Sequence, residues 1–312
     1  MRLRKSMIFL VVMNNHKCPI CLSNNTVDHF LTYDYRLHTT KSSILLKKCG
    51  NSKCMHIWSA VIPTKKEIES FYKDEFYQHS KKSTDLITYL NRKRFFKCIN
   101  NGVRTKVLDI GAGDGSLVSF LIEKGLEAYG LEPSKVGRNI AKKNWNVDLI
   151  PGDLSDIQSK RFDVINLSHV LEHVIDPLAI LEKINNLLDD NGCLSIEVPN
   201  IHSWEASIFK SIYINIDAPR HIHHFNKKSL SIALSKTGFS RASTSKELSV
   251  IQFPLSGIRS IENYLIFRSM DSVINKIFLK IIYIPYAILH IAINMLSSNK
   301  ICLSGTFTKA HE

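Results

Sequence analysis

The stretch that decides the fold spans residues 107–115 and reads Val107-Leu108-Asp109-Ile110-Gly111-Ala112-Gly113-Asp114-Gly115. Apolar residues typical of a buried strand lead into three glycines at alternate positions, and residues 116–124 continue with the apolar spacing of a helix. Because glycine has no side chain, such a turn lets a ligand approach the backbone, and the start of the helix offers free N–H groups. The stretch therefore predicts the first strand–helix turn of a doubly wound α/β sheet.

Further strands are predicted at short intervals, at residues 128–131, 147–150, 162–167, 193–198, 239–252 and 301–309. Helical spacing lies between them, as at 177–188 and 229–237, with Ser134 and Gly238 as caps. Strands and helices that alternate in this way are typical of a parallel sheet with helices on both faces. We expect the strand at 301–309 to end the sheet.

The glycine spacing also indicates the kind of ligand. It is G-x-G-x-G and follows an acidic residue, whereas dinucleotide-binding turns use G-x-G-x-x-G to hold a pyrophosphate. The shorter spacing suits a ligand that lacks phosphates and carries an amine. With these residues the chain resembles the class I S-adenosylmethionine-dependent methyltransferases, and the resemblance implies their Rossmann-like sheet.

The resemblance assigns a set of cofactor contacts. Asp109 would order the glycine turn and the methionine amine. Glu132, about twenty residues beyond the glycines and at the end of the second strand, would hold the ribose diol. Asp153 and Leu154 would meet the adenine. The complete expected set is Asp109, Gly111, Ala112, Gly113, Gly115, Glu132, Asp153, Leu154 and Ser168.

Two further stretches point to the acceptor. Residues 168–174 resemble the Leu-Glu-His segment of small-molecule methyltransferases, and no Asn/Asp-Pro-Pro-Tyr turn of the base-directed N-methyltransferases stands there. Residues 219–225 resemble a segment of methyltransferases linked to surface-polysaccharide and sugar modification. We therefore expect in-line SN2 transfer to a saccharide or small-molecule hydroxyl, with His221 as the first candidate for the base and His169 as the second. The alternative for at least two of the histidines in 219–225 is a structural cluster.

Four of the seven cysteines form two pairs, C-x2-C at Cys18 and Cys21 and C-x4-C at Cys49 and Cys54. Two such pairs bring four thiolates to tetrahedral positions around Zn²⁺, and a region of about fifty residues can hardly build a core without a metal. We expect a structural zinc knuckle, with His56 as an alternative fourth ligand and free thiols as the alternative to any metal.

The composition divides the chain into four expected parts. They are a zinc-knuckle region at 1–62, a helical linker or lid at 63–101, a methyltransferase core at 102–253 with 300–312, and an apolar helical insertion at 254–299. Residues 281–296 carry no Asp, Glu, Lys or Arg, but sixteen helical residues rise only about 24 Å, short of the roughly 30 Å of a bilayer core. Packing or dimerisation, peripheral membrane contact through 276–298, and spanning stay open as alternatives.

Charge limits the partners. The chain has a formal charge of +13, yet residues 105–200 hold 9 Lys or Arg against 15 Asp or Glu. An acidic core argues against nucleic acid in the catalytic centre, while basic flanks allow contact with anionic lipid, saccharide or RNA. We expect a cytoplasmic enzyme, with peripheral attachment to the inner face of a membrane as one option. Its acceptor would be a small molecule or a saccharide, and no nucleic acid is expected as a partner. An RNA methyltransferase and a non-catalytic cofactor-binding scaffold are the alternatives.

Overall fold

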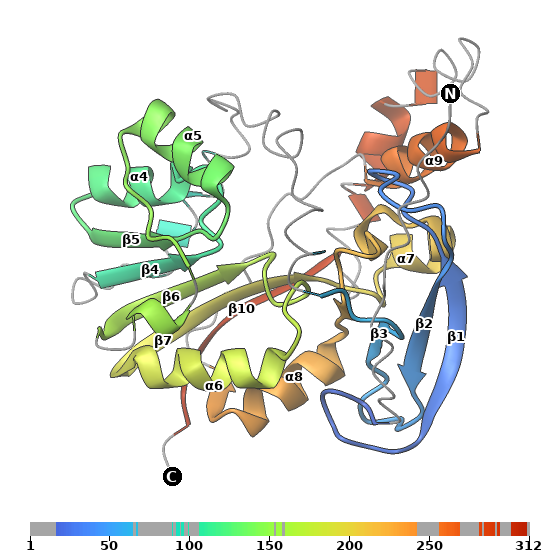
Figure 1. The fold of residues 1–312 in the computed structure, drawn as a ribbon, viewed down its shortest axis with the longest axis horizontal. Helices are drawn as coiled ribbons and strands as arrows, with labels where there is room; N and C mark the ends of the chain where they lie inside the picture. Colours follow the sequence, from blue (N-terminus) through green and yellow to red (C-terminus); the bar gives the residue numbers. More distant parts are fainter. Residues whose placement is uncertain are drawn as a thin grey trace.

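A computed structural model describes residues 17–64, 67, 89, 92–93, 95–96, 99, 106–152, 154–157, 160–241, 256–268, 281–282, 284–290, 292–293 and 301–310. These residues build two sheets that lie beside each other (Figure 1). The larger sheet has the order β5-β4-β6-β7-β10-β9, and the smaller has the order β1-β2-β3-β8.

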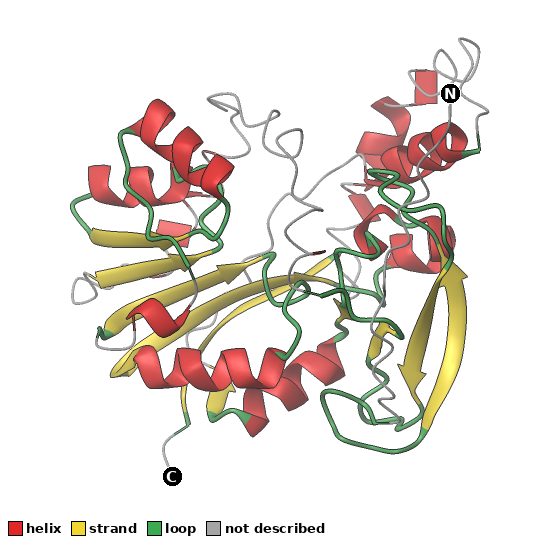
Figure 2. Cartoon of the chain, viewed as in Figure 1, coloured by secondary structure: helices red, strands yellow, loops and turns green. Residues whose placement is uncertain are grey.

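The larger sheet is the predicted doubly wound one. Its strands are β4 (Lys106–Ile110), β5 (Glu127–Leu131), β6 (Phe162–Ser168), β7 (Leu188–Pro199), β9 (Phe239–Arg241) and β10 (Cys302–Lys309). β5, β4, β6 and β7 pair in parallel, so their carboxyl ends meet at one edge. Figure 2 shows helices on both faces of this sheet. Their bounds are α4 (Ser116–Glu123), α5 (Lys135–Trp145), α6 (Pro177–Leu187) and α8 (Lys227–Lys236).

Three details of the predicted sheet were wrong. Residues 147–150 form only an isolated bridge, Leu131 with Ile150, because Pro151 follows and has no N–H to extend a ladder. β10 does not end the sheet but lies between β7 and β9, antiparallel to both. β7 begins at Leu188, five residues before the predicted start. Of the predicted strand at 239–252, only Phe239–Arg241 falls within the described residues.

The predicted helix caps agree with the structure at most positions. The Ser134 side chain accepts a hydrogen bond at the start of α5, and Gly238 adopts a left-handed φ of 77° after α8. Thr64 and Glu67 form a capping box before the expected helical linker. The start of α8 was predicted two residues late, because Asn226 is the cap and Ser229 completes its capping box.

The smaller sheet joins two distant parts of the sequence. Its strands are β1 (Thr26–Thr32), β2 (Ile44–Cys49), β3 (Ile57–Ser59) and β8 (His223–His224). β8 comes from the histidine-rich stretch and pairs antiparallel with β3 of the cysteine region. The cysteine region therefore shares a sheet with the stretch expected to meet the acceptor.

The described residues of the apolar insertion lie beside this smaller sheet (Figure 1). α9 (Ser256–Phe267) lies against α7 (Trp204–Phe209) and the short helix η3 (Ile214–Ile216), and the Ser260 hydroxyl accepts a hydrogen bond from the backbone N–H of Ile214 at 2.9 Å. Aromatic contacts join Phe267 of α9 to Tyr33 and Tyr35. Among the residues described, none belongs to a helix long and apolar enough to cross a bilayer.

Candidate active site

The glycine turn has the geometry that its sequence predicts. Gly111, Gly113 and Gly115 all adopt positive φ values, between 56° and 72°, where other residues are strained. A side chain at Gly111 would collide with Val170, whereas one at Gly113 would meet nothing nearer than 4.0 Å. The space beside Gly113 is therefore open for a ligand, and a Cβ there would fill it.

Glu132 closes one side of this space. It follows β5, is 5% exposed, and its two carboxylate oxygens accept hydrogen bonds from the backbone N–H groups of Gly113 and Ser134, both at 2.8 Å. Each carboxylate oxygen has a second lone pair that can accept from a ligand. A buried carboxylate held at the glycine turn suits the hydroxyls of a ribose, so these residues fit the implied cofactor.

Asp109 lies at the carboxyl end of β4 and contacts a residue that the sequence analysis missed. The Asn166 side chain donates to its carboxylate at 2.7 Å, and both side chains are buried. Burial raises the pKa of Asp109 to about 7, against the opposing effect of the Asn166 hydrogen bond. The carboxylate that accepts a hydrogen bond from the glycine turn is that of Glu132. The β4–β6 register pairs Asp109 with Asn166, which is the signal that could have identified it.

The other expected cofactor residues are Ala112, Ser168, Leu154 and Asp153. Ala112 belongs to the glycine turn, and its backbone N–H donates to the Leu131 carbonyl. Ser168 ends β6 at the same edge. Leu154, in the short helix η1 (Leu154–Ile157), has its side chain buried in the main core, which leaves its backbone for ligand contact. Asp153 lies outside the described residues.

His221 is held as a neutral imidazole with one nitrogen directed to a carbonyl. Its Nδ1–H donates to the Asn215 carbonyl at 2.7 Å, which leaves the lone pair on Nε2. Nε2 lies 4.0 Å from a Glu172 oxygen and 3.9 Å from an Asp217 oxygen. Burial and the nearby His173 lower the pKa of His221 to about 4, so it is uncharged at neutral pH.

His169 is in a different state. Its Nδ1 lies 3.3 Å from Glu172 and its Nε2 lies 3.1 Å from Glu197, so both ring nitrogens contact carboxylates. Burial opposes a charge on His169, but hydrogen bonds with Cys302, Glu172 and Glu197 raise its pKa well above the usual value. A ring that donates from both nitrogens is a cation and has no lone pair with which to accept a proton.

The remaining histidines of the stretch face opposite ways, as the extended conformation of β8 predicts. His223 Nε2 donates to the Ile175 carbonyl, and its Nδ1 lies 3.1 Å from His56 Nε2, so this side chain is structural. His224 is buried on the side of His221, and its Nε2 has no hydrogen-bond partner in the described part of the chain. Glu172 Oε2 is likewise without a partner among these residues.

A buried ion-pair network fixes the histidine stretch to the cysteine region. The Arg220 guanidinium is fully buried and contacts Asp34 at 2.7 Å and Asp217 at 2.5 Å. Asp34 also accepts from the backbone N–H groups of Leu37 and Thr39. Because buried charges are tolerated only when paired, this network sets the position of the chain just before His221.

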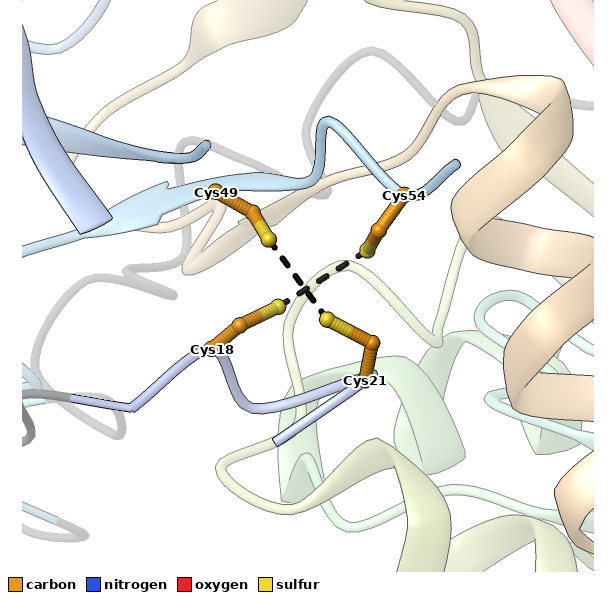
Figure 3. A group of neighbouring side chains, drawn as sticks. All are labelled: Cys18, Cys21, Cys49 and Cys54. Atoms are coloured by element: carbon orange, nitrogen blue, oxygen red, sulfur yellow. Dashed lines mark hydrogen bonds between the residues drawn. The ribbon is translucent and has the colours of Figure 1, made fainter. Parts of the chain in front are cut away.

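The four cysteines converge on one point (Figure 3). The Sγ atoms of Cys18 and Cys54 lie 3.8 Å apart and those of Cys21 and Cys49 lie 3.5 Å apart, and all four fall within 4.8 Å of one another. These distances are too long for disulfides. They match the edge of a tetrahedron with Zn–S bonds of about 2.3 Å, so the residues fit a zinc ion. His56 is not part of this group and contacts His223 instead.

Comparison with known proteins identifies the family of this chain. A family model described as a methyltransferase domain matches residues 77–243, just over half of the chain. The chain therefore belongs to the methyltransferase-domain family, and with its glycine turn and sheet order it is a class I S-adenosylmethionine-dependent methyltransferase.

The chain is similar to several methyltransferases. A ubiquinone biosynthesis O-methyltransferase of Actinobacillus pleuropneumoniae is 30% identical over 136 residues, which are 39% of this chain and 58% of that protein. One from Bradyrhizobium diazoefficiens is 30% identical over 133 residues, covering 39% and 51%. The chain thus spans just over half the length of these curated relatives. A solved 1,6-didemethyltoxoflavin-N1-methyltransferase of Burkholderia thailandensis has a TM-score of 0.49 at 14% identity, covering 91% of this chain and 99% of that one.

Proposed function

We propose that this enzyme methylates a hydroxyl group of a saccharide or surface-polysaccharide precursor. The observation that supports the proposal best is the state of His221, a neutral imidazole whose Nε2 is free to accept a proton. The named relatives are O-methyltransferases, which favours oxygen as the accepting atom. The likeness of residues 219–225 to sugar-modifying methyltransferases is the reason for preferring a saccharide.

The cofactor supplies a sulfonium methyl group that is already activated, so the protein mainly has to align the acceptor and remove its proton. Glu132 and the glycine turn would hold the cofactor, with Asp109, Ser168 and the 153–154 segment beside it. His221 Nε2 would accept the proton as the acceptor oxygen forms its bond to the methyl carbon. The imidazolium formed would be stabilised by Glu172 and Asp217, whose oxygens lie within 4.0 Å of Nε2.

The cationic His169 would position the site and not act as the base. Its two carboxylate contacts join Glu172, next to His221, to Glu197 at the end of β7. The charge of His169 helps to lower the pKa of Glu172 to about 2, against the effect of burial, so Glu172 stays ionised beside His221. The structure thus favours the first of the two expected bases.

Zinc in the four-cysteine group is part of the same proposal. The metal would crosslink the segment before β1, the end of β2 and the segment before β3, and β3 pairs with β8. With four protein ligands the ion would have no open position for chemistry. Its role would be to hold the smaller sheet, and through it the histidine stretch, in place.

The proposal is tested with His221→Ala and, as a matched control, His29→Ala, which removes an exposed histidine of β1. Methyl transfer would be measured with nucleotide sugars and lipid-linked saccharides as acceptors. We expect His221→Ala to lower kcat by about 10²–10⁴ with unchanged S-adenosylhomocysteine binding, as for loss of a general base. His29→Ala should match the wild type. Equal kcat in all three proteins would exclude His221 as the base.

A further inference from the structure

The second helix of the insertion is arranged with its polar side toward the protein. We call this the outer helix, and its described residues are 281–282, 284–290 and 292–293. It packs with α9 beside α7, the helix that directly follows the carboxyl end of β7. Tyr286 and His290 make polar contacts with the protein.

The inward contacts converge on Glu205 of α7, which is fully buried. Its carboxylate accepts hydrogen bonds from the Tyr286 hydroxyl at 2.5 Å, from His290 Nδ1 at 3.0 Å and from the Ser256 hydroxyl of α9. The Trp204 ring packs against His290. These bonds satisfy a buried charge, and they fix the rotation of the outer helix about its own axis.

Among the described residues, the face turned away from the protein is apolar. Ile281, Ile284, Ile288 and Leu289 are 68%, 67%, 65% and 54% exposed, and their spacing places them on one side of a helix. The other exposed positions among the described residues of the outer helix are Pro285 and Ala292. A surface helix normally buries its apolar stripe and exposes its polar one, so this arrangement is inverted.

We propose that this isoleucine face docks the enzyme on an anionic lipid bilayer. Four large aliphatic side chains in a row are suited to the boundary between headgroups and acyl chains, where an amphipathic helix lies parallel to the surface. The proposed interaction is peripheral, because the contacts of Tyr286 and His290 with Glu205 keep one side of the helix on the protein. This inference goes beyond the proposed function and does not depend on which acceptor is used.

Charge favours lipid over a second copy of the chain as the occupant. Arg259 of α9 and Arg268, which directly follows this helix, are exposed, and Lys276 and Lys280 precede the outer helix in the sequence. The insertion at 254–299 contains only Glu262 and Asp271 as acidic residues. Two copies of so basic an insertion would repel each other, whereas an anionic leaflet attracts its positive charge.

The test is sedimentation of the full chain with vesicles of equimolar phosphatidylglycerol and phosphatidylcholine, with pure phosphatidylcholine vesicles as the uncharged comparison. The variant is Ile281→Ser/Ile284→Ser/Ile288→Ser. The control is Val27→Ser/Leu31→Ser/Ile122→Ser, which removes three apolar side chains that are at least half exposed elsewhere. Thermal unfolding and S-adenosylhomocysteine binding of both variants show that each is folded.

We expect the wild type and the control to bind the anionic vesicles, and the isoleucine variant to bind at least roughly ten-fold more weakly because it exposes less apolar area. Binding should also weaken on uncharged vesicles and in high salt. Absence of wild-type binding to either vesicle would overturn the proposal. So would a wild-type dimer that the isoleucine variant converts to a monomer while vesicle binding is unchanged.

Discussion

Two parts of this enzyme are built in different ways. We call the glycine turn with Glu132 the cofactor side, and the histidine stretch 217–225 with the segments that hold it the acceptor side, after their proposed roles. On the cofactor side, Gly113 and Glu132 are nineteen residues apart and follow adjacent parallel strands. On the acceptor side, Arg220 reaches Asp34 across 186 residues of sequence, and Glu205 reaches His290 across 85. The first site depends on a local motif and strand order, and the second depends on contacts between distant segments. The two should therefore respond separately to substitution.

Removal of the metal from the cysteine group should have the largest effect on the acceptor side. Structural zinc contributes about 10–16 kcal/mol of apparent binding free energy, most of which is coupled to folding. We expect one zinc per chain by metal analysis. After chelation or Cys54→Ser, we expect loss of methyl transfer because β3 no longer holds β8. S-adenosylhomocysteine binding should persist, since the glycine turn lies on the other sheet.

The buried cysteine of β7 gives the control for this experiment. Cys193 is outside the four-cysteine group, so Cys193→Ala should keep its zinc and its activity. Zinc-free protein that retains full activity would show that the acceptor side does not depend on the metal.

Loss of the buried guanidinium should have the next largest effect. Arg220→Met leaves Asp34 and Asp217 without their buried counter-charge, which should lower the free energy of unfolding by about 3–5 kcal/mol. Arg36 also pairs with Asp217, at 3.0 Å, but its side chain is 41% exposed. Arg36→Met should therefore lower the free energy of unfolding by less than about 1 kcal/mol. Denaturant unfolding of the two variants measures the difference, and equal losses would contradict the assigned role of burial.

Acid should destabilise the acceptor side by a smaller amount. Burial lowers the pKa of His221 and His223 to about 4, of His224 to about 3, and of His56 well below 6.5. The unfolded chain binds these protons near pH 6.5 and the folded chain does not, so the free energy of unfolding should fall as the pH drops below 6.5. We expect a loss of at least about 2 kcal/mol between pH 7 and pH 5.

One buried carboxyl opposes this loss, because the pKa of Asp109 is raised to about 7 and its protonation in the folded chain adds stability as the pH falls from 7 to 5. Two further groups act mainly outside this pH range. The raised pKa of His169 contributes stability that is lost as the pH rises above 6.5, and the lowered pKa of Glu172 matters only near pH 4 and below. His224→Gln removes one of the buried groups and should flatten the profile between pH 7 and pH 5. Denaturant midpoints that stay constant over this range would contradict the neutral, buried state of the cluster.

The sequence predicted the cofactor side better because the information there is local. The glycine turn, Glu132 and the Ser134 cap each follow from a few neighbouring residues, and the structure places them together. Asn166 was missed although strand register pairs it with Asp109. The strand at 147–150 was predicted from apolar alternation, but Val147 and Leu149 instead pack against Ala141 and Val118.

The acceptor side could not be predicted in the same detail. Asp34 and Arg220 are ordinary charged residues in sequence, and only the fold buries them against each other. The apolar composition of residues 281–296 predicted a helix, but composition does not tell which side of the helix faces the protein. That depends on Glu205, a buried carboxylate in a separate helix.

The most direct test of the account is a calorimetric titration with S-adenosylhomocysteine of the wild type, Glu132→Ala, Glu123→Ala and His221→Ala. Glu132→Ala should bind at least about 100-fold more weakly, because in the proposed site this buried carboxylate would make charged hydrogen bonds to the ribose. The exposed Glu123 and the acceptor-side His221 should leave the affinity within about two-fold, since neither contributes a cofactor contact. Wild-type affinity in Glu132→Ala, or a well-folded wild type that does not bind, would contradict the assignment of the cofactor site.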